Sequence, residues 1–168
     1  MSEIVTIQYK PIGMIHTEYT EQKSTPIQSI YSKSRGTVEL FPEYTAGLKD
    51  LEGFSHIILI YHFHRAGEPS LITHPFMDYK TERGIFATRH YNRPNPIGLS
   101  IVRLAGIKDN ILEIDGIDVL DGTPLLDIKP YVSLFDRPEN VRCGWFDEPD
   151  VASVKAEKYT PDELRNRP

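Results

Sequence analysis

The stretch that decides the fold is residues 54–63, which read FSHIILIYHF. Its longest uninterrupted apolar run is Ile57–Tyr61. Successive side chains of a β-strand point to opposite faces, so Ile57, Leu59 and Tyr61 share one face of the strand. The even-numbered residues share the other face; they include His56 and His62, and His64 follows at the next even position. The pattern predicts a strand over Phe54–Phe63.

Further short strands are predicted on both sides of this one. They are expected at Ile4–Tyr9, Met14–His16, Thr37–Leu40, Ile85–Thr88, Leu99–Leu104, Ile111–Ile114, Val119–Leu120 and Leu125–Ile128. Thirteen prolines and eleven glycines interrupt the chain, which favours short strands over long helices. The pair Asp121-Gly122 lies between two of the predicted strands and is typical of a hairpin turn.

Helix is predicted at only two places. Tyr44–Glu52 is expected to form a short helix that ends at Gly53. Residues 160–163, Thr-Pro-Asp-Glu, form a capping box with proline at the first helical position, and start a short C-terminal helix. Many short strands and little helix predict an all-β fold, either a barrel or a sandwich.

Length, charge and cysteine content limit the class of protein. The 168 residues predict a single domain over 1–168, and the net charge of −5 does not suggest a generic nucleic-acid binder. Cys143 is the single cysteine, which excludes an internal disulfide and a multi-cysteine zinc site. No apolar run approaches the roughly 18 residues of a membrane helix, and the N-terminus lacks the features of a secretion signal. These features predict a cytoplasmic protein without membrane association.

Three histidines follow the even positions of the central strand and its end. His56, His62 and His64 fall on one predicted face, where imidazoles can bind a metal ion. The alternative is that they form local hydrogen bonds or contact a cofactor, and we favour this alternative because one strand does not establish ligand geometry. No metal is therefore expected, although a metal-dependent barrel enzyme that uses these histidines remains an alternative hypothesis.

The second constellation is a basic segment from Arg83 to Gly106. It holds four arginines and a histidine, with no Asp or Glu, in a chain of net negative charge: Arg83, Arg89, Arg93, Arg103 and His90. Arginine presents a fork of donors that matches carboxylate and phosphate oxygens. The segment predicts an anion site, for a phosphodiester or for the carboxylate of a cofactor.

Inside this segment lies RPNPIGLS, residues 93–100. Each proline pushes the residue before it out of the helical region, so the segment is expected to be rigid and extended. It would present the amide of Asn95 beside backbone carbonyls, an arrangement that can hold an exocyclic amine. The alternative is an ordinary Asn-Pro turn.

The third constellation is a row of carboxylates: Asp115, Asp118, Asp121 and Asp127. Carboxylates can hold a cationic ligand or a ribose, or act as general bases. Asp115 and Asp121 are also candidate turn residues, because each precedes a glycine. Asp127 lies within an apolar strand and needs a partner, for which Lys129 is the nearest candidate. The chain lacks the glycine-rich nucleotide loops, the Gly-x-Ser-x-Gly elbow and the His-Glu-x-x-His motif, which disfavours Rossmann, NTPase and common hydrolase chemistry.

Four blocks in order resemble the TsaA-like family, which includes the tRNA adenine-N6 methyltransferases called TrmO. They are PIGMIHTEY (11–19), RGTVELFPEYTAGLKDLEGFSHIILIYHFHRA (35–66), GIFATRHYNRPNPIGLSIVRL (84–104) and GIDVLDGTPLLDIKPY (116–131). The resemblance covers about residues 9–135 and leaves residues 136–168 as a tail. It implies a small non-Rossmann β-barrel that binds S-adenosylmethionine, a homodimer, and methyl transfer to threonylcarbamoyl-modified adenosine beside a tRNA anticodon.

The resemblance also implies a set of cofactor contacts. They are Ser29, Ile30, Tyr31, His64, Arg65, Arg89, Leu99, Asp115, Gly116, Ile117 and Asp118. We expect Arg89 to hold the cofactor carboxylate or a phosphate, Asp118 the ribose or a cationic group, and Leu99 the adenine face. The chain ends before the added C-terminal region of longer bacterial members, and it reads Ala87-Thr88-Arg89-His90-Tyr91 at the family's ATRS-type turn.

Two further roles complete the hypothesis. Asn95, the Pro96 carbonyl or Asp121 is expected to orient the reacting amine, and Arg83 and Arg93 are expected to contact RNA phosphates. The main alternative is a sensor on the same barrel that binds S-adenosylmethionine or a nucleotide without catalysis.

Overall fold

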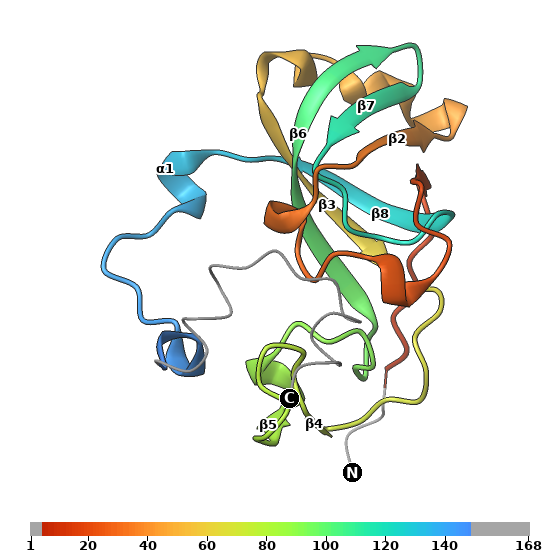
Figure 1. Ribbon diagram of the computed structural model, residues 1–168. Coiled ribbons are helices and arrows are strands. Elements are labelled where there is room, and N and C mark those ends of the chain that lie inside the picture. The colour runs from red at the N-terminus through yellow and green to blue at the C-terminus, as the bar shows by residue number, and fades with distance from the viewer. Residues whose placement is uncertain (1–4, 149–168) are drawn as a thin grey trace.

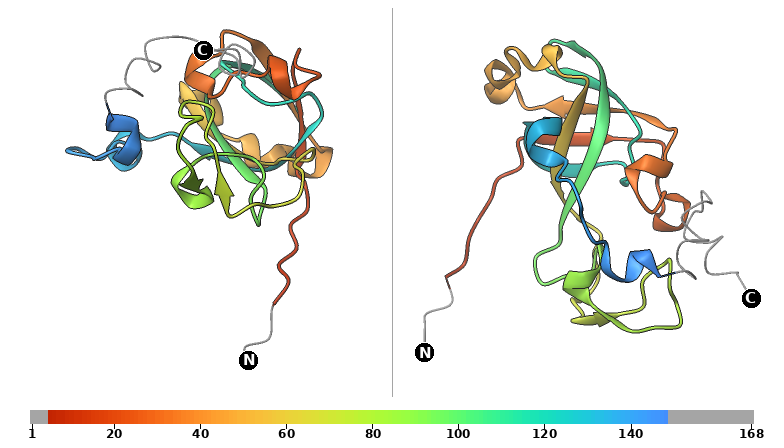
Figure 2. Two further views of the ribbon diagram at one scale, coloured as in Figure 1. Left: turned by 60° about the horizontal axis from the view of Figure 1, so that its bottom comes forward. Right: turned by 90° about the vertical axis from the view of Figure 1, so that its left-hand side faces the viewer.

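A computed structural model of the chain describes residues 5–148. Six antiparallel strands close into a barrel in the order β1-β2-β7-β6-β3-β8, in which β8 pairs with β1 (Figures 1 and 2). The strands are β1 (Gly13–His16), β2 (Arg35–Leu40), β3 (His56–His62), β6 (Ile97–Lys108), β7 (Ile111–Asp115) and β8 (Thr123–Pro130). The expected small all-β barrel without a Rossmann unit is confirmed.

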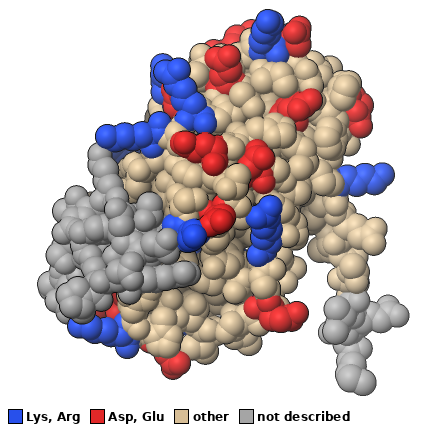
Figure 3. Space-filling view, turned by 45° about the vertical axis from the view of Figure 1, so that its right-hand side comes forward, with Lys and Arg blue, Asp and Glu red and all other residues tan. Residues whose placement is uncertain are grey.

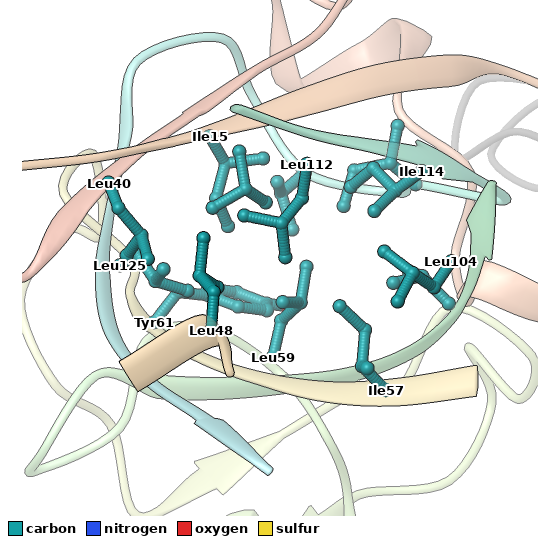
Figure 4. Packing of buried hydrophobic residues seen from close by; sticks show 14 residues of the cluster. Ile15, Leu40, Leu48, Ile57, Leu59, Tyr61, Leu104, Leu112, Ile114 and Leu125 are labelled. Atoms are coloured by element: carbon teal, nitrogen blue, oxygen red, sulfur yellow. The ribbon is translucent and has the colours of Figure 1, made fainter. Parts of the chain in front are cut away.

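The alternation read from residues 54–63 sets which face of β3 is inside. Ile57, Leu59 and Tyr61 are buried, and they pack with aliphatic side chains from the other barrel strands (Figure 4). On the neighbouring strand β6 the inward positions are Gly98, Ser100, Val102 and Leu104. Closure of the barrel leaves no strand of this sheet without two partners, which removes the exposed edges of an open sheet.

Short elements outside the barrel make up the rest of the described chain. They are the two-residue strands β4 (Ile72–Thr73) and β5 (Arg83–Gly84), the 3₁₀ helices η1 (Gln22–Ser24), η2 (Ser29–Tyr31), η3 (Pro42–Leu48), η4 (Leu51–Gly53), η5 (Ile85–Ala87) and η6 (Gly144–Asp147), and the α-helix α1 (Ser133–Asp136). β4 and β5 pair beneath one end of the barrel, and α1 lies to one side of it (Figure 1). Within residues 5–148, no helix reaches the length and apolar character that a membrane span requires.

Three predicted strands are wrong within the described residues. Residues 5–9 are exposed and pair with no strand, although Val5, Ile7 and Tyr9 alternate as in a strand. Residues 85–87 form the 3₁₀ helix η5 and not a strand, and Ile85 is the buried residue of this helix. Val119 and Leu120 are buried in the loop between β7 and β8, and Val119 packs in the hydrophobic core. A short apolar run in the sequence does not distinguish a strand from a loop that buries one or two apolar side chains.

The turn and helix predictions need correction as well. The 44–52 helix is replaced by two 3₁₀ helices, η3 and η4, which are separated at Asp50, a residue in the left-handed region with φ of 68°. Gly122 has the expected positive φ of 72°, but β7 and β8 are joined by the longer loop 116–122 and not by a two-residue hairpin turn. The predicted helix from Thr160 lies outside the described residues.

Candidate functional site

A small hollow of about 30 Å³ lies at one end of the barrel, where several loops meet. Its lining comes from η1 and the residue after it, the segment after β3, the loop before β6, the β7–β8 loop and the first residue of β8. The lining residues are Gln22, Thr25, Phe63, His64, Arg65, Ala66, Tyr91, Asp118, Val119, Leu120 and Thr123. Three of the expected cofactor residues, His64, Arg65 and Asp118, therefore meet at one place.

Among the residues that line this hollow, Asp118 is the one that carries a carboxyl group. Burial raises its pKa to about 6, because a charged carboxylate loses solvation there. Ser100 donates a hydrogen bond of 2.5 Å to Asp118 Oδ1, and the backbone N–H of Ser29 and the nearby charge of Arg89 also favour the ionised form. Arg89 itself donates to Gln28 Oε1 at 2.9 Å. Ser29 and Arg89 thus lie close enough to Asp118 to act on its carboxyl group, and the roles of all three as cofactor contacts stay predictions.

Two residues after β3 complete this wall of the hollow. Burial lowers the pKa of His64, and the neighbouring positive charge of Arg65 lowers it further. His64 is therefore a neutral imidazole at pH 7, with Nδ1 3.5 Å from Thr123 Oγ1. Arg65 donates to the carbonyl of Thr20 at 3.0 Å, which ties the segment after β3 to the loop after β1.

The loop that carries Asp118 is held against η2. Ser32 Oγ donates to the carbonyl of Ile117 at 2.5 Å, and Ile117 is fully buried. Gly116 has a φ of 84°, and a Cβ added there would lie 3.5 Å from the Ser29 carbonyl oxygen. A side chain at this position would be strained by the positive φ. These contacts explain why residues far apart in sequence reach one site.

Other expected cofactor residues do not lie in the hollow. Asp115, at the end of β7, bridges Arg103 Nη1 at 2.8 Å and Arg35 Nε at 3.4 Å on the outside of the barrel. Leu99 points outward from β6 and is 47% exposed, whereas its neighbour Ser100 points inward. Ile30 in η2 is also exposed. Tyr31 follows Ile30 in η2, which packs beside β6.

The two residues expected to orient the reacting amine are in different surroundings. Asn95 is exposed in the turn before β6, and its backbone carbonyl accepts a hydrogen bond from Ile97. Asp121 Oδ1 accepts from the backbone N–H of Thr17 at 3.1 Å and lies 3.4 Å from His16 Nδ1. Nothing in these contacts joins the two, and their roles stay predictions.

The two arginines expected to contact RNA both have protein partners. Arg83 pairs with Asp78 at 2.9 Å and Glu148 at 3.2 Å and lies over the ring of Trp145. Arg93 donates to the backbone carbonyls of Thr88 and His90. Basic and acidic side chains are interspersed on the face shown in Figure 3. Arg83 and Arg103 are thus paired with carboxylates, whereas Arg89 and Arg93 donate to neutral oxygens. Sequence order alone does not reveal these partners.

The three histidines separate in space. His56 and His62 lie on the outer face of β3, whereas His64 follows the end of the strand and lines the hollow. Among residues 5–148, no group of three or more His, Cys, Asp or Glu side chains is arranged to hold a metal ion. Asp127 pairs with Lys129 at 2.8 Å as expected, but its side chain is 44% exposed.

The sequence analysis missed two hydroxyl groups of this site. Tyr61 and Ser100 are both buried, and their oxygens are 2.9 Å apart. Burial raises the pKa of the Tyr61 phenol, so the phenol remains protonated. The available signal was a serine at an inward position of β6, where the strand otherwise carries glycine, valine and leucine.

Comparison with known proteins identifies the family. Residues 14–137 match the family model of the tRNA-methyltransferase O N-terminal domain. This chain belongs to the TrmO family. The match spans every strand of the barrel except the first residue of β1, and it includes the loop that carries Asp118.

Other members of the TrmO family are similar over most of this chain. A probable S-adenosyl-L-methionine-binding protein of Pyrococcus abyssi is 58% identical over 143 residues, covering 84% of this chain and 77% of that protein. The crystal structure of TrmO from Pseudomonas aeruginosa has a TM-score of 0.73 and 41% identity, over 88% of this chain and 66% of that one. The human tRNA (adenine(37)-N6)-methyltransferase is 35% identical, over 79% of this chain and 32% of the human protein. The chain thus spans less than two thirds of several relatives.

Proposed function

We propose that this chain is an S-adenosylmethionine-dependent methyltransferase that acts on the exocyclic amine of a threonylcarbamoyl-modified adenosine beside a tRNA anticodon, in the cytoplasm. The observation that carries the proposal is the buried carboxyl group of Asp118, which lines the hollow and lies within reach of the charge of Arg89. Family membership supports the reaction and the cofactor, because relatives are named for S-adenosylmethionine and for methyl transfer to tRNA adenine.

The charges of the site fit the charges of this cofactor. S-adenosylmethionine carries a sulfonium, an ammonium and a carboxylate. Asp118 would accept from the ribose or attract a cationic group, and Arg89 would pair with the carboxylate. His64 is neutral and so adds no positive charge close to the sulfonium. The backbone of Ser29 and the loop at Gly116 would enclose the ligand from the side of η2.

The transfer itself is an in-line displacement. The S–CH₃ bond breaks as the N–CH₃ bond forms, the cofactor leaves as a neutral thioether, and the amine proton passes to an acceptor. Positioning supplies much of the rate in such a reaction. In this proposal Asn95, the Pro96 carbonyl or Asp121 orients the amine. Arg93 and Arg83 contact phosphates, which for Arg83 requires that a phosphate replace the half-exposed Glu148.

The first test is cofactor binding followed by methyl transfer. Titration of the purified chain with S-adenosylmethionine in a calorimeter, with ATP as the control ligand, is expected to show saturable and selective binding. Asn95→Ala and Asp121→Ala are expected to lower the rate of methyl transfer to modified tRNA by about 10²-fold while binding of the cofactor persists. Full activity of both variants would refute their assignment.

The same experiment separates the alternatives. Binding without transfer to any tRNA would favour the non-catalytic sensor. Absence of binding by the folded chain, with and without tRNA, would refute the cofactor assignment. Stoichiometric metal in the purified protein would favour a metal-dependent barrel enzyme that uses His56, His62 and His64.

We also propose that the chain forms a homodimer through the outer face of β6. Ile97, Leu99 and Ile101 are each 41–47% exposed there and form a continuous apolar strip. Leu99 and Ser100 project to opposite sides of the strand, so Leu99 is directed away from Asp118 of its own chain. In a homodimer, Leu99 would instead approach the cofactor held by the partner copy.

Ile101→Glu tests this interface. The substitution places a charge at one end of the apolar strip, so sedimentation velocity is expected to show a monomer where the unchanged chain sediments as a dimer. Leu134→Glu, on the exposed helix α1, is the matched control and is expected to leave the dimer intact. A monomeric unchanged chain, or a dimeric Ile101→Glu variant, would contradict the proposal.

A further inference from the structure

The barrel core contains one polar side-chain atom in an otherwise hydrocarbon cluster. Of the described side chains in that cluster, only Tyr61 carries oxygen, and it is 3% exposed. Its hydroxyl meets Ser100 Oγ at 2.9 Å, and Ser100 is 2% exposed. Burying two hydroxyls where phenylalanine and alanine would fit brings a desolvation penalty that their mutual bond offsets only in part. Packing alone therefore does not account for the presence of these two buried hydroxyl groups.

The direction of the hydrogen bonds leads to Asp118. An ionised carboxylate only accepts, so the single proton of Ser100 is donated to Asp118 Oδ1 at 2.5 Å. Ser100 Oγ can then only accept from Tyr61, whose phenol keeps its proton. The chain of donors runs from the core outward and ends on the carboxylate that lines the hollow.

The other groups around Asp118 differ from Ser100 in how they act on the carboxylate. The backbone N–H of Ser29 donates to the carboxylate from the side of η2, and Arg89 acts on it through charge alone. His64 and Arg65 line the same hollow from the end of β3. The backbone N–H of Asp118 itself also donates to the carboxylate, so its backbone donors are those of Ser29 and Asp118. The Ser100 bond is thus the side-chain contact that fixes where Oδ1 lies.

We propose that Tyr61 and Ser100 are positioning residues that hold the Asp118 carboxylate ionised and aimed into the hollow for a ligand with cationic or hydrogen-bond donor groups. The inference deepens the proposed function and rests on it for the identity of that ligand. Because each hydroxyl donates toward the carboxylate, each stabilises its charged form against the burial that favours the neutral form.

The test measures Asp118 with and without the cofactor. The carbon resonance of its carboxyl group is followed from pH 4 to pH 9 in the ligand-free chain and in Ser100→Ala and Tyr61→Phe. Ser100→Ala is expected to raise the titration midpoint by about one pH unit, and Tyr61→Phe by a smaller amount in the same direction. Thr88→Val is the matched control: it removes a buried hydroxyl that donates to the Ile85 carbonyl and does not line the hollow, so it should leave the Asp118 midpoint in place.

The second readout is affinity for S-adenosylmethionine across the same pH range. Ser100→Ala and Tyr61→Phe are expected to weaken binding about two- to fivefold at pH 7, with less loss at pH 9, where the carboxyl group is ionised in every variant. Wild-type midpoints in both variants would overturn the proposal, and Tyr61→Phe alone decides it if Ser100→Ala does not fold. Shifted midpoints in a chain that never binds S-adenosylmethionine would support the positioning role and refute the proposed function instead.

Discussion

Gly98→Ala is expected to unfold the barrel or to destabilise it by about 3 kcal/mol or more. Gly98 lies opposite Tyr61 on the neighbouring strand, and the Tyr61 ring covers its α-carbon. An added Cβ would lie 2.6 Å from Tyr61 Cζ and 2.8 Å from Phe63 Cζ. Neither ring is free to move, because Tyr61 is bonded to Ser100 and packs edge-on against Phe63. Urea unfolding followed by circular dichroism measures the loss.

A matched glycine and a double substitution test the cause. Gly47 is exposed in η3 with open space around its α-carbon, so Gly47→Ala is expected to change the free energy of unfolding by less than about 0.5 kcal/mol. Combining Gly98→Ala with Tyr61→Leu should destabilise less than the sum of the two single changes, because the smaller side chain frees the space. Strict additivity would mean that Tyr61 is not what excludes the methyl group.

Asp118→Asn is expected to change stability and cofactor binding in opposite directions. The folded carboxyl group has a pKa of about 6, so between about pH 4 and pH 6 it keeps a proton that the unfolded chain releases. The free energy of unfolding therefore falls as the pH rises through this interval, by an amount on the order of 3 kcal/mol. The amide that replaces the carboxyl group has no charge to bury, so this decline should be lost and the variant should be the more stable protein at pH 7.

Binding follows the charged form of the carboxyl group. The affinity of the unchanged chain for S-adenosylmethionine is expected to rise as the pH increases through 6, and Asp118→Asn is expected to lose about tenfold or more in affinity at pH 7.5. Asp127→Asn removes a half-exposed carboxylate paired with Lys129 and should alter neither property appreciably. Calorimetric titrations at pH 5 and pH 7.5 measure the binding. A variant that binds as tightly as the unchanged chain would remove Asp118 from the site.

Much of the barrel was predictable because its strands carry local signals. The alternation at residues 54–63 set the inward face of β3, and prolines and glycines placed most strand ends. The errors came from apolar residues that serve as single anchors: Ile85 begins a 3₁₀ helix, and Val119 and Leu120 fill a loop. An apolar side chain indicates that the residue is buried, but a buried residue can lie in a strand, a 3₁₀ helix or a loop.

The site was predictable only in part. His64, Asp118 and Arg89 were expected from their blocks in the chain, and the structure brings them to one end of the barrel. Arg83, by contrast, stood in a segment without acids but is paired with Asp78 and Glu148. Charge along the sequence does not predict charge in space, because the partners come from other loops.

The sequence by itself determined most strands of the barrel and the family. These depend on neighbouring residues and on blocks in a fixed order. The tertiary structure alone decided that Tyr61 and Ser100, 39 positions apart, meet inside the barrel and direct their protons toward Asp118. The register of β3 against β6 and the folding of the β7–β8 loop over the barrel end create that contact, and both are set by closure of the whole sheet.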